Sequence, residues 1–210
     1  MTQYFETRQW VPFSLERVFA FFADPRNLPR LMPPELQSRI EDIQLVPPSI
    51  PPQSMPLASA NGKRPSANVF AGVGSKVVVN FRPIKWLPLR VSWLAKVVAF
   101  EWNSHTIDEQ VRGPFAKFHH RHSTEPELRN GLEGTLVSDQ IEYALPYGFL
   151  SRPANSFVRK ELEHSFEWRQ QRLTQILTLE ARVAEAQILR DIPIFLPATA
   201  HRDPSHYHPQ

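Results

Sequence analysis

The feature of this sequence that most constrains its fold is a series of strand-like segments followed by one uninterrupted helical segment. Apolar and polar residues alternate in five stretches, at 75–84, 89–100, 104–113, 115–125 and 134–145. The connections between them are too short for parallel crossovers, so we predict antiparallel hairpins, with the last turn at 126–133. From about Pro153 to Leu189 the period becomes helical, with an apolar stripe of Phe157, Leu162, Phe166, Leu173, Ile176 and Leu177.

The N-terminal part supplies the remaining elements. Residues 4–11 show the alternation of a strand, and residues 37–46 are predicted as another strand. Between them we predict a short helix at 14–24, which ends at Asp24-Pro25, and a second helical segment at 26–31. The terminal helix carries the only long apolar stripe that can cover the sheet. We therefore predict an α+β fold in which a curved antiparallel β-sheet wraps around a long C-terminal α-helix, with two short helices after the first strand.

Proline is abundant and glycine is scarce, with 21 and 7 residues in a chain of 210. Six of these prolines fall between Pro47 and Pro65, where no apolar period survives. We predict one domain at 1–190 with a Pro-rich insertion at 47–74, followed by a flexible tail at 191–210. The absence of cysteine excludes disulfide bonds, thiolate metal sites and a cysteine nucleophile.

Charge and hydropathy narrow the choice of partners. Residues 62–121 contain ten basic and three acidic side chains, but the basic ones alternate with apolar residues along predicted strands. This pattern is typical of a solvated sheet face, so we predict no nucleic-acid partner. No apolar run is long enough to span a membrane, and the N-terminus lacks the pattern of a signal peptide. We expect a soluble cytoplasmic protein; transient membrane contact and the oligomeric state stay open.

Alternation along neighbouring strands places several polar side chains on one inward face. In the segment 115–125, Lys117, His119 and Arg121 belong on the outer face, which turns the intervening residues inward. The preceding and following strands then bring carboxylates level with these histidines, so that His120 can meet Asp139. The predicted ligand-binding patch contains Asp108, Gln110, His120, His122 and Asp139, bordered by Trp93, Phe118 and Tyr143.

Four interpretations of this patch stay open. It can be a buried hydrogen-bond network that fixes the strand register, or the polar end of an otherwise apolar ligand pocket. It can be an acid/base site in which His120, with Asp139 or Asp108, moves a proton. A metal site at His120 and His122 has only one His-x-His pair behind it, so we predict no metal and no cofactor. Outside the patch, we interpret Phe19, Phe22 and Trp168 as core residues, and a solvated helix face as formed by Arg159, Lys160, Glu161, Glu163, Glu167 and Arg169.

Several segments of the chain carry a family resemblance. They are 18–22 with 24–28 and Pro33-Pro34, 108–115, 119–122, and 139–143 leading into 145–148. Together they resemble the START-like, helix-grip (SRPBCC) superfamily, and within it a bacterial subgroup of ligand-binding and polyketide cyclase/dehydrase-like proteins. The resemblance, which covers about residues 4–177, implies a helix-grip fold enclosing an apolar cavity for molecules such as lipids, quinones, sterols or polyketides. This superfamily shares a cavity and not one chemistry.

Three functions follow as hypotheses. The first is a non-enzymatic binding or carrier protein for a hydrophobic or amphipathic small molecule. The second is an enzyme of the cyclase or dehydratase type that uses His120 with Asp139 or Asp108. The third is a protein-interaction module that recruits a partner through the Pro-rich segment 47–65 and the late part of the helix.

Overall fold

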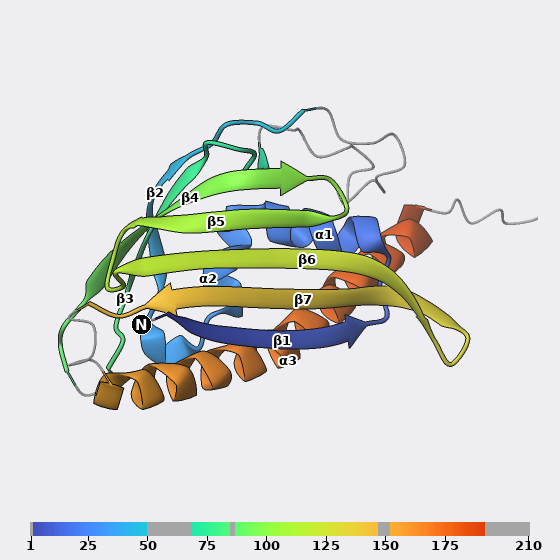
Figure 1. Ribbon diagram of the computed structural model, residues 1–210. Coiled ribbons are helices and arrows are strands. Elements are labelled where there is room, and N and C mark those ends of the chain that lie inside the picture. The colour runs from blue at the N-terminus through green and yellow to red at the C-terminus, as the bar shows by residue number, and fades with distance from the viewer. Residues whose placement is uncertain (1, 50–68, 85–86, 147–151, 192–210) are drawn as a thin grey trace, which may run out of the picture.

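The computed structural model describes residues 2–49, 69–84, 87–146 and 152–191, which form a curved sheet and a set of helices (Figure 1). All neighbouring strands are antiparallel, and the seven-stranded sheet has the order β1-β7-β6-β5-β4-β3-β2. The strands are β1 (Gln3–Val11), β2 (Arg39–Gln44), β3 (Lys76–Phe81), β4 (Val91–Glu101), β5 (His105–Arg112), β6 (Lys117–Arg129) and β7 (Leu132–Ala144). The helices are α1 (Leu15–Ala23), α2 (Leu28–Leu31) and α3 (Arg152–Asp191), with 3-10 turns η1 (Pro25–Asn27) and η2 (Pro34–Leu36). The predicted fold class is therefore confirmed.

The hairpin between β6 and β7 is longer than the sequence pattern indicated. The predicted turn at 126–133 is wrong, because both strands continue to a tight turn at Asn130 and Gly131, whose φ angles are 51° and 78°. Two positive φ angles suit an Asn-Gly pair in a two-residue hairpin turn. Pro126 is tolerated within β6 because β5 pairs only as far as Ser123, so the later part of β6 has one neighbour.

Helix α3 covers the sheet with its apolar stripe. In Figure 1 it runs diagonally from below β1 toward the far end of the sheet, while α1 and α2 lie behind the strands. Its buried residues Leu173, Ile176 and Leu177 form the largest core cluster with residues of β1, α1, α2 and β7. Phe157, predicted as part of the same stripe, is 48% exposed. Among the described helices none is both long and apolar enough to cross a lipid bilayer.

The ends of the Pro-rich segment come together beside the sheet. The Gly72 amide donates to the Val46 carbonyl at 2.9 Å, and the Ser75 hydroxyl accepts from the Val46 amide at the same distance. A β-carbon at Gly72 would lie 2.8 Å from the Val46 oxygen, so this approach requires glycine. Residues 50–68 and 192–210 lie outside the described part of the chain, and the limits of the insertion and of the tail stay predictions.

Candidate functional site

A cavity of about 410 Å³ lies between the sheet and the helices. Its volume falls in the range of small-molecule pockets, roughly 300–1,000 Å³. Side chains from β3 to β7, from the α1–α2 region and from α3 line it, and most of them are apolar or aromatic. They include Phe21, Phe22, Leu31, Val79, Phe81, Trp93, Phe115, Phe118, Ile141, Leu162 and Phe166. The fold thus encloses an apolar space large enough for an organic molecule.

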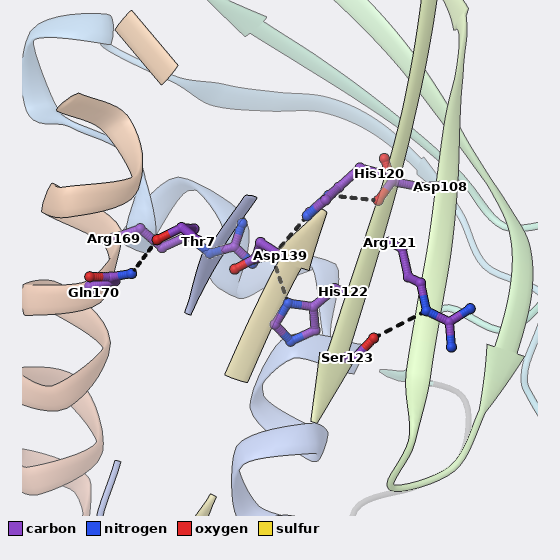
Figure 2. Close-up of polar contacts among 9 residues, drawn as sticks. All are labelled: Thr7, Asp108, His120, Arg121, His122, Ser123, Asp139, Arg169 and Gln170. Atoms are coloured by element: carbon purple, nitrogen blue, oxygen red, sulfur yellow. Dashed lines mark hydrogen bonds and ion pairs between the residues drawn. The ribbon is translucent and has the colours of Figure 1, made fainter. Parts of the chain in front are cut away.

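Strand register brings a set of charged side chains into one wall of this cavity. Asp108 on β5 lies opposite His120 on β6, and His122 lies opposite Asp139 on β7. His120 Nδ1 is 3.2 Å from Asp108 Oδ1, and His120 Nε2 is 2.8 Å from Asp139 Oδ1. The same Asp139 oxygen is also 2.8 Å from His122 Nδ1. Figure 2 shows His120 between Asp108 and Asp139, with His122 also beside Asp139.

The cluster has a fifth member, Arg169, which comes from helix α3. We predicted Arg169 on a solvated face of the terminal helix, and this is wrong: its side chain is 16% exposed and reaches toward Asp139 (Figure 2). Its Nη2 atom is 3.6 Å from Asp139 Oδ1, and its guanidinium lies 4.9 Å from the ring centre of Phe22 and 5.2 Å from that of Phe166. This cation contacts two aromatic faces and a buried carboxylate. Because the carboxylate belongs to Asp139 of β7, the ion pair links α3 to the sheet.

The surroundings of His120 hold it in the protonated form. Burial alone lowers the pKa of this imidazole, but the carboxylates of Asp108 and Asp139 outweigh burial and raise it from 6.5 to about 9. Both ring nitrogens face a carboxylate oxygen, and an imidazole donates from both nitrogens only when it carries two protons. His120 is therefore an imidazolium at neutral pH.

His122 and Asp139 are shifted by the same neighbours. Burial is the largest influence on His122 and lowers the pKa of its imidazole below 6.5, since Asp139 opposes it only in part. Burial alone would raise the pKa of the Asp139 carboxyl, but Arg169 and the two histidines hold it well below its usual 3.8. His122 is thus neutral near pH 7, and its Nδ1–H donates to the Asp139 carboxylate.

Not all of the predicted patch lies on the cavity. Trp93, Asp108, Phe118, His120 and His122 line it, whereas Asp139 lies behind the histidines. The predicted place of Gln110 is wrong, because its amide turns to the backbone of Phe115 at 2.7 and 3.3 Å and closes the turn after β5. Tyr143 is 2% exposed in the core, beside Phe115. Whether the five lining residues bind a ligand stays a prediction.

Phe22 was interpreted as a core residue, but it also borders the site. Its ring centre is 3.9 Å from that of His122, and it lines the cavity. The helix period placed Phe22 on the apolar face of α1, but no local signal in the sequence showed that this face meets β6. Phe19, in contrast, is fully buried against Phe100 and Trp102, and belongs to a separate core cluster.

The donor atoms of His120, His122 and Asp139 lie within 4.8 Å of one another, a spacing that a divalent cation could bridge. Two imidazoles and a carboxylate form a donor set that suits zinc and non-haem iron. In this structure the same atoms bond to one another, and the Arg169 guanidinium stands beside the shared oxygen. A metal would have to replace both histidine–aspartate bonds and approach a neighbouring cation, so the donors fit poorly. The prediction of no metal remains a prediction.

The fold and the cavity together define a class of protein. A curved antiparallel sheet that holds a long C-terminal helix across an apolar cavity is a helix-grip architecture. The family model described as "Polyketide cyclase / dehydrase and lipid transport" matches residues 11–167, and the chain belongs to this family. The resemblance to START-like, helix-grip (SRPBCC) proteins is confirmed. No curated protein sequence matches the chain significantly.

Solved structures share the fold at low sequence identity. TTHA0849 from Thermus thermophilus has a TM-score of 0.53 and 17% identity, and the match covers 88% of this chain and 99% of the other. Ara h 8.0201 has a TM-score of 0.50 and 14% identity, with 83% of this chain and 99% of the other covered. At these identities the likeness supports the architecture and no specific ligand.

Proposed function

We propose that this protein binds, and carries, one hydrophobic or amphipathic small molecule inside the cavity between the sheet and α3. The observation that supports this proposal is the cavity itself, about 410 Å³ with a mostly apolar and aromatic wall that includes members of the charged cluster. An apolar pocket with a few convergent polar groups is the usual form of a small-molecule site. The family description, which names lipid transport beside cyclase and dehydrase activity, agrees with a hydrophobic ligand.

The ligand-binding proposal can be tested by filling the cavity from one strand. Val97 on β4 lines the cavity, whereas its neighbour Val98 is 37% exposed. Val97→Phe should lower the affinity for the neutral fluorescent dye Nile red, because the new ring occupies the binding space. Val98→Phe adds the same ring outside the cavity and should leave dye binding unchanged.

Native mass spectrometry of protein purified from its own host supplies the second readout. A carrier should retain a small apolar molecule, and the Val97→Phe protein should retain less of it than the Val98→Phe protein. Equal retention by both variants, or absence of dye binding to the unmodified protein, would contradict the proposal.

A second candidate is an enzyme of the cyclase or dehydratase type. The observation that favours it is the His120 imidazolium, which borders the cavity between two carboxylates. In a dehydration the His120 Nδ1–H would turn from Asp108 to a leaving hydroxyl and give it the proton, and the released Asp108 carboxylate would remove a proton from the adjacent carbon. The test is turnover of the molecule found by mass spectrometry: His120→Gln should abolish conversion but retain binding. Full conversion by this variant would rule out the mechanism.

The third hypothesis, a protein-interaction role of the Pro-rich segment, concerns residues that are mostly outside the described ranges. It stays a proposal that rests on composition. Pull-downs with and without residues 47–65 test it, and identical partners in both would reject it.

A further inference from the structure

The charged cluster limits which polar group the cavity can hold. It contains two carboxylates, Asp108 and Asp139, and two cations: His120 contacts both carboxylates, and Arg169 contacts Asp139. The remaining member, His122, donates one proton to Asp139 and is neutral. The net charge of the cluster is therefore zero before any ligand enters.

We propose that the molecule bound in the cavity has an uncharged hydroxyl at its polar end, which donates to Asp108, and that a carboxylate on the same apolar body is rejected. This inference rests on the proposed binding function and names the chemical class of the ligand. It follows from the arrangement of charges around one wall of the cavity.

Asp108 is the member of the cluster most open to a ligand. Its side chain is 29% exposed, compared with 12% for His120, 16% for Arg169 and 7% for Asp139. It lines the cavity, and its Oδ1 faces His120 Nδ1. Within the described part of the chain its second oxygen accepts no hydrogen bond, so it can accept one from a ligand hydroxyl.

The charges of the two cations are already offset by protein carboxylates. His120 directs both ring nitrogens at Asp108 and Asp139. Arg169 lines the cavity between the rings of Phe22 and Phe166, and its Nε has no hydrogen-bond partner among the described residues, but Asp139 offsets its charge. A ligand carboxylate would therefore be a third negative charge beside Asp108, facing two cations whose charges are already offset. A ligand ammonium would add a third cation beside His120, whereas a hydroxyl leaves the net charge of the cluster unchanged.

Three probes with the same apolar chain separate these cases: decanol, decanoate and decylammonium, each competing with Nile red at neutral pH. We expect decanol to displace the dye at a concentration about tenfold or more below that needed with either charged compound. Equal or tighter binding of decanoate or decylammonium would overturn the inference but leave the binding function standing. Failure of Nile red to bind at all would instead remove the binding function.

Asp108→Asn tests the source of the selectivity. The substitution removes one negative charge from the cavity wall, so the preference for decanol over decanoate should shrink or reverse. Glu109→Gln is the matched control, because Glu109 is the exposed neighbour on the same strand and its substitution removes the same charge outside the cavity. An unchanged preference in Asp108→Asn would contradict the role of Asp108. If that variant does not fold, the ranking of the three compounds on the unmodified protein still decides the inference.

Discussion

The proton on His120 should make the protein lose stability as the solution becomes alkaline. In the folded protein the pKa of this imidazole is raised from 6.5 to about 9, so the folded state holds the proton more tightly than the unfolded chain does. The resulting stabilisation is fully present below pH 6.5 and is lost as the pH rises through about 9. At ~1.4 kcal/mol for each unit of pKa, the loss amounts to roughly 3–4 kcal/mol.

The other buried groups of the cluster affect the stability of the protein at acidic pH. The pKa of His122 is lowered in the folded state, so below pH 6.5 the unfolded chain binds a proton that the folded protein does not, and stability falls. The pKa of Asp139 is also lowered, so its contribution is present above its usual 3.8 and is lost as the pH falls through the folded value. The free energy of unfolding should therefore be greatest near pH 6.5 and decline on both sides.

Urea denaturation followed by tryptophan fluorescence, repeated across this pH range, measures the free energy of unfolding. His120→Gln should be less stable at neutral pH, because two carboxylates lose their shared cation. Its stability should decline much less toward pH 9, because only the exposed His164, whose pKa is raised by its hydrogen bond to Glu35, still contributes. His119→Gln is the control, because it removes an imidazole from the opposite face of β6 and should keep the alkaline decline. A free energy that is flat between pH 6.5 and 9 in the unmodified protein, or a decline equally steep in His120→Gln, would refute this reasoning.

Three further substitutions test the fold around the cluster by the same denaturation assay. Asp139→Asn leaves two buried cations without their shared carboxylate and should cost about 3–5 kcal/mol; a cost below ~1 kcal/mol would show that water reaches the site. Leu177→Ala removes a fully buried side chain and should cost about 2–5 kcal/mol, whereas Leu179→Ala on the exposed face of the same helix should cost under ~0.5 kcal/mol. Gly134→Ala places a β-carbon 2.5 Å from both the Trp10 ring and the Val11 carbonyl oxygen and should cost about 1–3 kcal/mol; an unchanged midpoint would contradict this close approach of β1 to β7.

Most of the sheet was predictable from the sequence because alternation is a local signal. A period of two residues assigns each side chain of a strand to one face, and burial of Phe118 and His122 between the exposed or half-buried Lys117, His119 and Arg121 follows that assignment. The pairing of β1 with β7 was not predictable in this way. These strands are far apart in the sequence, and no turn between them fixes a register.

Gln110 shows where alternation stops being informative. Its position in the strand pattern places it on the same face as Asp108, but the strand ends within two residues, at Arg112. Near a strand end the backbone amide and carbonyl of the turn compete for a nearby side-chain amide, and the turn residue Phe115 obtains both bonds. Sequence alternation has no means of detecting this competition.

The misplacement of Arg169 has a different cause. The position lies three residues after Phe166 and four before Leu173, which is the spacing of the buried face of α3, yet its charge suggested a solvated face. Spacing was the better guide here, because the inward face of the sheet supplies Asp139 as a partner and two rings as a lining. A charged residue in register with an apolar stripe therefore indicates a buried counter-charge on the opposing element.

The two carboxylates of the cluster have separable roles, and the difference follows from their depth. Asp139 is 7% exposed and interacts with two histidines and the arginine of α3, so it joins β6, β7 and the helix. Asp108 is 29% exposed and touches the cluster through His120 alone, so it can meet a ligand without disturbing that junction. Substitution at Asp139 should therefore change stability before selectivity, and substitution at Asp108 should change selectivity before stability. Under the proposed binding function, substitutions on β5 can therefore change the ligand preference while the contact between sheet and helix stays intact.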